Sequence, residues 1–248
     1  VGQLVADEGF AGIAVSMAEM PEEVAFNDSL VTASAIVALP VLARKCSAAG
    51  LVGFEWAVGV PGSIGGAVRM NAGGHGSDMQ ASLQGASIVD LHTGQTSWVE
   101  AARLGLRFRG SDLADHQVVV DATIGLQHGD IVASEAMLSE IVRWRREHQP
   151  GGQNAGSVFV NPVPGELAAA QLIDGLGLRG FRIGGACVSE KHANFIQAQP
   201  GATAADVRAV IEHVRSEVHT RAGFLLRSEV RLVGFADLVH DDREGVAL

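Results

Sequence analysis

Residues 154–162, NAGSVFVNP, bring one hydroxyl, that of Ser157, to the end of a run of small residues. A surface loop could have this composition without a chemical role, and a hydrolase would use it to expose a nucleophile. The stretch has neither a GxSxG elbow nor a nearby histidine, although the order of His75, His148 and His192 does not exclude a triad. The third possibility is a serine that donates a proton. Because a hydroxyl is a weak acid, the acceptor would have to be a strongly basic carbanion or enolate.

The segment of residues 57–79, AVGVPGSIGGAVRMNAGGHGSDM, carries too many glycines for a helix or a regular strand. Glycine permits positive φ and close approach of the backbone to a ligand, and successive free N–H groups form anion-binding nests. The segment predicts either a loop around a phosphate-bearing cofactor or a glycine-rich turn region, and composition does not choose between them. It matches neither GxxxxGK[ST] nor a well-placed GxGxxG.

Three charged side chains outside these loops could take part in chemistry. Arg107 and Arg109 flank Phe108, and in an extended segment both would point to one face, where an arginine can stabilise negative charge or hold a phosphate. Glu229 could assist protonation if burial raised its pKa above the usual value of about 4.3. On residue type alone, paired surface arginines and a solvated strand glutamate are the commoner cases.

The bulk composition disfavours several classes of protein. The 248 residues carry a net charge of −10, which disfavours sequence-independent nucleic-acid binding. Cys46 and Cys187 have no metal-type spacing, so we expect buried thiols and no metal site. No apolar stretch could span a bilayer and no signal peptide opens the chain, so we expect a cytoplasmic protein with no membrane partner.

The elements that must position these residues indicate an α+β fold. In the first half we expect a strand–turn–strand unit, a strand, a hairpin around Gly94 and a further strand (residues 4–17, 29–38, 86–101 and 116–126). A short helix over 41–49 has Pro40 in its first turn and ends at Gly50. A helix over 135–149 marks the predicted boundary between domains of residues 1–132 and 133–248.

The second domain is predicted to run helix, strand, strand, helix, strand (from residues 168, 181, 194, 203 and 228). Thr203 and Asp206 form a capping box for the last helix, and Gly223 suits its C-terminal end. One apolar face of that helix carries Val207, Val210, Ile211, Val214 and Val218. Gly184-Gly185 would let another chain segment or a ligand approach the strand, with packing the commoner case, and Asn194 is expected to tie down a turn.

Taken together, these segments resemble one family, the UDP-N-acetylenolpyruvoylglucosamine reductases (UDP-N-acetylmuramate dehydrogenases, MurB). The similar motifs are VADEGF, GFEWAVGVPGSIGGAVRMNAGGHG, RFRGS, NAGSVFVNP, GLRGFRIGGACVSEKHANFI and SEVRLVGF, in that order over nearly the whole chain. The resemblance implies an FAD-binding domain of the vanillyl-alcohol-oxidase/PCMH type followed by a smaller α+β substrate-binding domain. It also implies a monomeric, cytoplasmic oxidoreductase of peptidoglycan synthesis and cell wall biogenesis, which serves cell shape, the cell cycle and cell division.

The family reaction implies a role for each motif. NADPH reduces FAD, and hydride then passes from flavin N5 to UDP-N-acetylglucosamine enolpyruvate, which becomes UDP-N-acetylmuramate. By motif position, Ser157 is the proton donor to the adjacent carbon, and Arg109 and Glu229 stabilise the enolate-like intermediate. The same matching places substrate contacts on Asn161, Phe108 and Gly156. It places flavin contacts on Val58, Gly59, Pro61, Gly62, Ser63, Ile64, Gly65, Gly66, Asn71, Ala72 and Gly73.

The chain departs from the family pattern in several places. It opens at Val1-Gly2-Gln3, where the family's GxGSN-like loop would end, so we expect the N-terminal subdomain and part of the pyrophosphate cradle to be missing. Phe108 stands where Tyr is usual, and Val160 stands where many members have Lys. No extra insertion separates residues 118–126 from the basic helix, which indicates the shorter subtype.

Two alternatives to this reductase follow from the sequence. The early start would also fit a non-catalytic UDP-sugar-binding remnant that has lost flavin, and flavin content separates that case from an enzyme. A different oxidoreductase on the same flavin fold is the other alternative. The serine loop and the C-terminal motifs disfavour it, because they lie outside the shared flavin-binding region.

Overall fold

The computed structural model describes residues 2–163 and 165–235, which belong to two compact units. The central unit is Val15–Arg145, and the terminal unit joins Val1–Ala14 to Arg146–Leu248. The chain therefore changes unit at Arg145/Arg146, whereas the sequence placed a boundary at 132/133. The segment that opens the chain packs with the C-terminal half and not with the residues that follow it.

A five-stranded antiparallel sheet organises the central unit in the order β2-β3-β9-β7-β8. Its strands are β2 (Val24–Asn27), β3 (Leu30–Ser34), β7 (Leu83–Asp90), β8 (Thr96–Glu100) and β9 (Gln117–Gly125). This confirms the predicted strand after residue 29, the hairpin around Gly94 and the strand from residue 116. Ala33, Ala122 and Ala86 pair across three neighbouring strands and are all fully buried. Such small side chains let a helix pack closely on the sheet.

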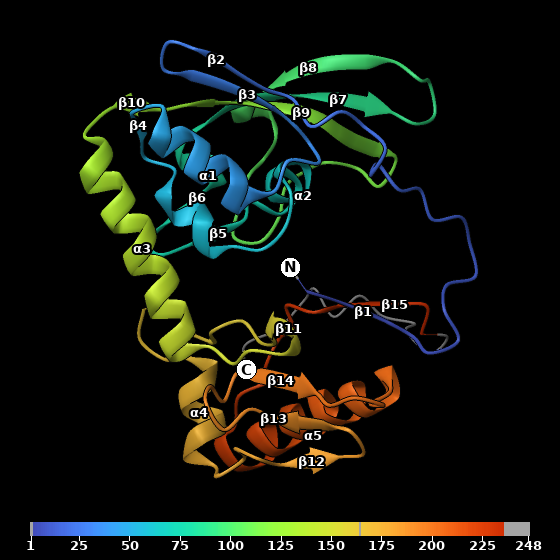
Figure 1. Ribbon diagram of the computed structural model, residues 1–248. Coiled ribbons are helices and arrows are strands. Elements are labelled where there is room, and N and C mark those ends of the chain that lie inside the picture. Colours follow the sequence, from blue (N-terminus) through green and yellow to red (C-terminus); the bar gives the residue numbers. More distant parts are fainter. Residues whose placement is uncertain (1, 164, 236–248) are drawn as a thin grey trace. The chain divides into compact units, whose positions relative to one another are not determined.

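The helices α1 (Leu39–Ala48) and α2 (Ile64–Met70) lie on one face of this sheet, as Figure 1 shows. The remaining elements of the unit are η1 (Glu55–Gly59), η2 (Met79–Ala81), η3 (Ala101–Arg103) and the short strand pairs β4–β10 (Leu51–Val52, Gln127–His128) and β5–β6 (Gly73–Gly74, Ser77–Asp78). Helix α3 (Ile131–His148) follows; it starts four residues before the predicted helix of residues 135–149 and ends one residue before its predicted end. Buried Glu55 accepts from Ser134 Oγ at 2.6 Å, which ties η1 to α3.

The predicted strand–turn–strand over residues 4–17 is only partly correct. β1 (Gln3–Val5) and a turn at Asp7-Glu8 are present, but residues 11–17 form neither helix nor strand. Ile13 is 90% exposed and Val15 is 83% exposed. The apolar alternation fits a strand, but within the described residues no other strand pairs with this segment, and a single strand is not stable by itself.

The terminal unit contains a four-stranded sheet in the order β11-β14-β13-β12 (Gln153–Ser157, Phe195–Ala198, Ala186–Val188, Arg182–Ile183). The single strand predicted over residues 181–188 is wrong, because Gly184-Gly185 turns the chain and β12 pairs antiparallel with β13. A Cβ at Gly185 would lie 2.6 Å from Ala202 Cα, so the expected close approach of another segment is confirmed. β1 pairs in parallel with β15 (Arg231–Val233).

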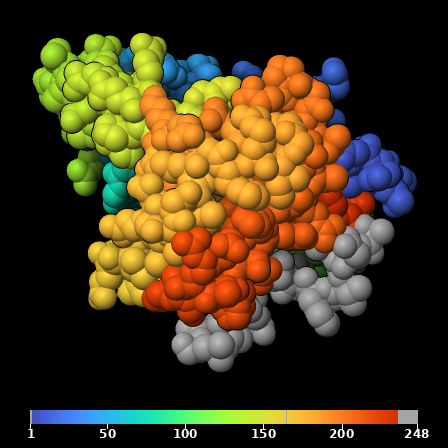
Figure 2. Space-filling model, turned by 90° about the horizontal axis from the view of Figure 1, so that it is seen from below, coloured from blue at the N-terminus to red at the C-terminus, as the bar shows by residue number. Residues whose placement is uncertain are grey.

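Two helices, α4 (Ala169–Gly175) and α5 (Ala204–Ala222), complete the terminal unit. The capping box of Thr203 and Asp206 and the left-handed Gly223 at the end of α5 are confirmed, as is the predicted valine-rich buried face. Asp206 also accepts from Gly185 N–H at 2.9 Å, and this bond, with that from Thr203, lowers the pKa of its carboxyl. Figure 2 shows the packed surface of this unit, whose later residues are coloured orange and red.

Both cysteines are free and buried, as predicted. Burial, with a smaller contribution from the carboxylate of Glu55, raises the pKa of Cys46 to about 12. Among the helices of the described residues, none is both long and apolar enough to cross a lipid bilayer.

Candidate functional site

The expectation that the glycine-rich segment of residues 57–79 forms no helix is wrong, because Ile64–Met70 form α2, and part of the segment is held by the fold itself. The N–H groups of Ile64 and Gly65 donate to the carbonyls of Val37 and Ala35, each at 2.9 Å. A Cβ at Gly65 would lie 2.8 Å from Ala35 Cβ, closer than real contacts allow. Ile64 and Gly65 therefore fasten the start of α2 to the segment that follows β3, and glycine is required at 65 for packing.

The neighbouring backbone is open. In the ranges 2–163 and 165–235, no protein group accepts a hydrogen bond from the N–H of Gly62 or Ser63. Gly62 has a φ of 123° and nothing within 4 Å of an added Cβ, while exposed Gly66 would meet only Ser63 Oγ, at 3.6 Å. Free amides on a surface without side chains fit the approach of a phosphate-bearing cofactor.

Two of the three predicted flavin residues that precede this surface are buried beneath the loop. Val58 and Gly59 are buried in η1, and a Cβ at Gly59 would lie 2.8 Å from both His75 Nε2 and Ile141 Cγ2. Pro61 is exposed. The first two predicted contacts thus shape the loop from beneath, and Pro61 belongs to its accessible side.

Asn71 ends α2 in the left-handed conformation, with a φ of 39°. Its buried amide is engaged at both ends: Nδ2 donates to Asp78 Oδ2 at 3.1 Å, and Oδ1 accepts from Gln80 N–H at 2.9 Å. Ala72 is buried beside it, and a Cβ at Gly73 would lie 2.6 Å from Asp78 Cβ. These three predicted flavin residues fix the β5–β6 hairpin.

The expectation that Arg107 and Arg109 share the face of an extended segment is wrong. Arg107 and Gly110 exchange both backbone hydrogen bonds, at 3.0 and 3.1 Å, so Phe108 and Arg109 form the tip of a tight turn. Arg107 pairs with Asp112 at 2.5 Å. Arg109 has a φ of 54°, a strained conformation for a residue with a Cβ.

A hollow of about 430 Å³ lies beside this turn. Arg109 Nη1 donates to Gly73 O at 3.2 Å, and its guanidinium lies 5.1 Å from the centre of the Phe108 ring. The lining brings together four residues that the sequence predicted separately; it comprises Asn71, Gly73, Gly74, Gly76, Ser77, Asp78, Ala81, Phe108 and Arg109. Ser111, which is not among the predicted site residues, donates from its Oγ to Arg69 O at 2.7 Å and so holds the following loop.

Ser157 ends β11, where the pairing with β14 is irregular. It is half-buried and lies opposite Phe195. Gly156 precedes it with a φ of 79°, and Asn154 Oδ1 accepts from Gly156 N–H at 2.9 Å. The small-residue approach is thus an Asn-stabilised turn that needs glycine at 156.

The fold brings Glu229 to the serine loop although the two are far apart in sequence. Glu229 N–H donates to Val158 O at 2.7 Å, and Val160 N–H donates to Arg227 O at 2.9 Å. Half-buried Glu229 therefore lies on the segment beside the one that follows Ser157. Arg109 belongs to the central unit and Ser157 and Glu229 to the terminal unit.

Asn161 has a structural contact within the chain. Its Oδ1 accepts from Ala169 N–H at 3.1 Å, at the first turn of α4, and Gln171 Oε1 accepts from Ala168 N–H at 2.9 Å. The predicted substrate residue therefore helps to begin a helix. Its side chain is otherwise exposed.

Among the described residues, Asp90, His92 and His116 bring potential metal ligands within 4.8 Å of one another. The two imidazoles stack 4.2 Å apart at 12°. One ion cannot lie in two parallel ring planes at once, so at least one ring would have to turn before the two could share an ion. The prediction that the chain holds no metal remains a prediction.

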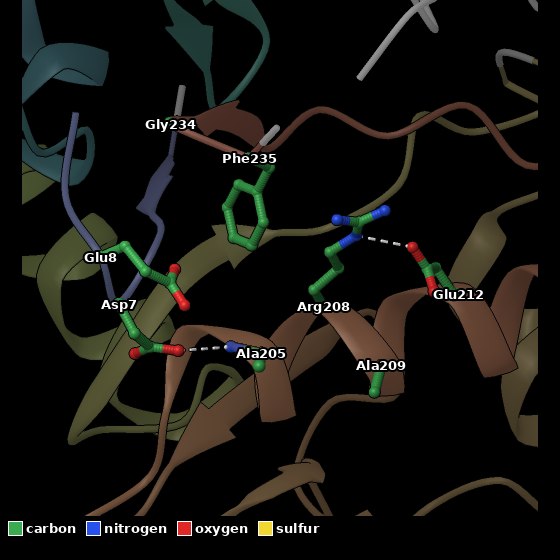
Figure 3. Close-up of a pocket in the computed structure, with 8 residues that line it drawn as sticks. All are labelled: Asp7, Glu8, Ala205, Arg208, Ala209, Glu212, Gly234 and Phe235. Atoms are coloured by element: carbon green, nitrogen blue, oxygen red, sulfur yellow. Dashed lines mark hydrogen bonds and ion pairs between the residues drawn. The ribbon is translucent and has the colours of Figure 1, made fainter. Parts of the chain in front are cut away.

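A second hollow, of about 400 Å³, lies in the terminal unit and contains none of the predicted site residues (Figure 3). Asp7 accepts from the N–H groups of Ala204 and Ala205, at 2.7 and 3.0 Å, and so caps α5. The Arg208 guanidinium lies 5.2 Å from the centre of the Phe235 ring and pairs with Glu212 at 2.7 Å. Asp7, Arg208 and Glu212 are thus engaged in helix capping and pairing.

His192 lies in the turn before β14. Its Nδ1 accepts from Asn194 N–H at 3.2 Å, so a neutral ring carries its proton on Nε2. Burial, then the positive charge of Arg179, and last His148 lower the pKa of His192, while a backbone hydrogen bond acts against them.

We expect acid to destabilise the protein partly through His192. Because its folded-state pKa lies below the ordinary 6.5, the unfolded chain binds the proton more readily. The contribution of neutral His192 to the free energy of unfolding should therefore be fully present above pH 6.5. It should be lost as the pH drops from 6.5 towards the folded-state pKa. Urea unfolding at pH 7.5 and 5.5 should show a smaller loss for His192→Asn, whose amide oxygen can replace Nδ1 as the acceptor. Equal losses in both proteins would exclude this contribution.

Comparison with known proteins places both units. Residues 2–100 match the sequence profile described as "FAD binding domain", and residues 148–233 match "UDP-N-acetylenolpyruvoylglucosamine reductase, C-terminal domain". The enzyme of that name from Heliobacterium modesticaldum is 43% identical over 93% of this chain and 74% of its own length. That of Prochlorococcus marinus is 39% identical over 94% and 80%. The crystal structure of the reductase (MurB) from Thermus caldophilus has a TM-score of 0.71 and 32% identity, over 81% of this chain and 72% of that one.

The fold and these matches first define a class: an FAD-binding oxidoreductase whose flavin domain is followed by a separate α+β domain. The predicted α+β fold and domain order are confirmed. The chain belongs to the UDP-N-acetylenolpyruvoylglucosamine reductase family.

Proposed function

We propose that this protein catalyses the NADPH-dependent, FAD-mediated reduction of UDP-N-acetylglucosamine enolpyruvate to UDP-N-acetylmuramate, a step of peptidoglycan precursor synthesis. The observation that carries the proposal is the similarity to the named reductases, which extends over 93% of the chain and through both domains. The serine loop and Glu229, which lie on adjacent segments, support it.

FAD, when bound and reduced by NADPH, would supply the hydride that adds to one carbon of the enolpyruvyl double bond. The electron pair of that bond then rests on the adjacent carbon, next to the carboxylate. Such a centre is basic enough to take a proton from a serine hydroxyl. We assign this proton to Ser157 Oγ, so that one hydride and one proton convert the alkene to the saturated ether.

We assign two further roles to Arg109 and Glu229. A guanidinium carries two parallel donors that match a carboxylate, so Arg109 is suited to stabilise charge that develops there. Its left-handed backbone supports this role, because strained residues concentrate at functional sites. Glu229 is assigned to the same intermediate, and its position beside the serine loop supports that assignment.

For the cofactor, we propose direct contact with the exposed or half-buried residues Pro61, Gly62, Ser63, Gly66 and Gly73. Val58, Gly59, Ile64, Gly65, Asn71 and Ala72 would shape that surface from below, since their backbone or side chains are buried. We propose that Phe108, Gly156 and Asn161 face the UDP-sugar. Of these, Phe108 offers an aromatic ring that is 61% exposed.

We also propose that the enzyme acts as a monomer in the cytoplasm, where UDP-sugars are made. Through its product it would serve cell wall biogenesis, cell shape, the cell cycle and cell division. Light scattering of the purified protein gives the oligomeric state. Complementation of a conditional reductase-deficient strain tests the cellular role.

The function is tested in two half-reactions. The purified protein should be yellow, NADPH should bleach the flavin absorbance under anaerobic conditions, and the enolpyruvyl UDP-sugar should restore it. A colourless protein that still binds the UDP-sugar would instead identify a non-catalytic remnant. Bleaching by NADPH without recovery on addition of this substrate would indicate a different oxidoreductase.

Arg109→Lys should lower turnover about tenfold, which corresponds to about 1.4 kcal/mol of transition-state stabilisation. Lysine keeps the charge but loses the planar two-point contact. Arg107→Lys is the matched control, because Arg107 lies at the base of the same turn and pairs with Asp112 instead. Steady-state rates for both variants, at equal flavin content, check the prediction. An equal loss in the two variants would make Arg109 a structural residue of the turn.

A further inference from the structure

Asn194 makes an unusual set of contacts for a side chain in a turn. It is 5% exposed and immediately precedes β14. Its Oδ1 accepts from Phe159 N–H at 2.9 Å, and its Nδ2 donates to Phe159 O at 2.8 Å. Its own backbone carbonyl accepts from Val158 N–H at 2.9 Å. One residue thus forms three buried hydrogen bonds with the two residues that follow Ser157.

Asn194 is itself held firmly. Its N–H donates to His192 Nδ1 at 3.2 Å, and Phe195 N–H donates to His192 O at 3.0 Å. Buried Ser189 Oγ accepts from the N–H of Lys191 at 3.1 Å and from that of His192 at 3.4 Å. The turn is therefore closed by its own side chains, and it presents the Asn194 amide in one orientation.

The segment after Ser157 is fixed on its other side as well. Val158 O accepts from Glu229 N–H, and the side chain of Phe159 is 2% exposed. On the N-terminal side of Ser157, Gly156 has no atom within 4 Å of an added Cβ, and the one side-chain hydrogen bond that the described residues give it runs from its N–H to Asn154 Oδ1. The placement of Ser157 therefore depends mainly on the residues after it, and Asn194, in the turn before β14, supplies three of their hydrogen bonds.

We propose that Asn194 is a positioning residue that sets the hydroxyl of Ser157 for proton transfer. The proposal rests on the function given above, with Ser157 as the proton donor. An asparagine is needed because the site requires one acceptor and one donor at the two ends of a planar group. Aspartate keeps the acceptor for Phe159 N–H but cannot donate to Phe159 O, and alanine leaves both backbone groups buried and unpaired.

Asn194→Ala should slow reoxidation of the reduced flavin by the enolpyruvyl substrate about 10- to 100-fold, while flavin reduction by NADPH stays within twofold. The solvent deuterium isotope effect on reoxidation should rise, because proton transfer from a misplaced hydroxyl limits the rate more strongly. Asn194→Asp should also slow reoxidation selectively and raise the isotope effect, but by a smaller factor. It replaces the alanine variant as the test if that variant does not fold. Val214→Ala, in the buried face of α5, is the control for lost stability and should leave the isotope effect unchanged.

A double-variant cycle distinguishes positioning from a separate effect. Ser157→Ala combined with Asn194→Ala should be no slower than Ser157→Ala alone, because Asn194 acts only through that hydroxyl. Independent, multiplicative losses would overturn the inference, as would an unchanged isotope effect in both Asn194 variants. If the flavin of Ser157→Ala is reoxidised at the normal rate, Ser157 is not the proton donor. That outcome tests the proposed function separately, because it needs no Asn194 variant.

Discussion

Ser157→Ala should slow the reoxidation half-reaction by about 10² to 10⁴, the range that a positioned general acid contributes. The bleaching of the flavin by NADPH should remain within about twofold of the wild-type rate, because that step needs no proton from this hydroxyl. Stopped-flow spectroscopy resolves the two steps in one protein sample. A selective loss of this size would connect the small-residue loop of residues 154–157 directly to protonation.

The fold gives a physical reason to expect this selectivity. Ser157 is half-buried at the end of β11, and the bonds around it come from backbone groups and from Asn154 and Asn194. Alanine keeps the Cβ and all of those bonds. The free energy of unfolding should therefore change by no more than about 0.5 kcal/mol.

Ser228→Ala is a matched control on the neighbouring segment. Ser228 Oγ lies 3.4 Å from Val158 O and accepts from Val230 N–H at 3.1 Å, so it belongs to the same small region of the terminal unit. Its loss should leave both half-reactions within a few-fold of wild type. Comparable slowing of reoxidation in the two serine variants would mean that the hydroxyls act through local structure. Unchanged reoxidation in Ser157→Ala would assign the proton to another group.

Local signals in the sequence predicted α5 almost completely. The cap of Thr203 and Asp206, the spacing of the buried valines and the glycine at 223 are all determined within the helix or one residue beyond it. The helix after Pro40 and the hairpin around Gly94 were accessible for the same reason, since proline and glycine restrict the backbone where they stand.

The relation between Ser157 and Glu229 could not be predicted from composition or periodicity. It depends on the pairing of Phe159 with Ser228, two residues that no local pattern connects. Only the resemblance suggested that the two belong to one site. The same reason explains why Asn194 was expected to hold a turn but not to reach the backbone after Ser157.

The turn at Arg109 was mispredicted because alternating residue types resemble an extended strand. Three contacts stabilise a turn instead. They are the paired backbone bonds of Arg107 with Gly110, the ion pair of Arg107 with Asp112, and the hydrogen bond from Ser111 Oγ to Arg69 O. Each contact needs a partner that the alternating pattern does not bring near: Gly110 and Asp112 approach Arg107 only when the chain folds back, and Arg69 lies in α2. A positive φ at an arginine is costly by itself, so residue propensities do not suggest it.

Gly65→Ala should destabilise the protein by about 1–3 kcal/mol, the usual cost of forcing extra atoms into a packed core. The added Cβ would lie 2.8 Å from Ala35 Cβ and 3.4 Å from Ala35 O, and Gly65 N–H is already bonded to that carbonyl. Relief requires α2 to move away from β3. Because the open amides of Gly62 and Ser63 lie at the start of α2, flavin content should fall together with stability.

Gly66→Ala separates the packing role of these glycines from a ligand-binding role. Gly66 lies in α2, is exposed and would meet only Ser63 Oγ at 3.6 Å, so alanine should stabilise the apoprotein by about 0.5–1 kcal/mol through helix propensity. Thermal unfolding and flavin absorbance of both variants give two independent readings. A more stable Gly66→Ala protein with less flavin would identify Gly66 as a residue against which the cofactor lies, because a methyl group there can obstruct only something outside the chain. Normal flavin content in Gly66→Ala would remove that contact from the proposed surface, and normal stability in Gly65→Ala would show that α2 is not tied to β3 as tightly as the distances require.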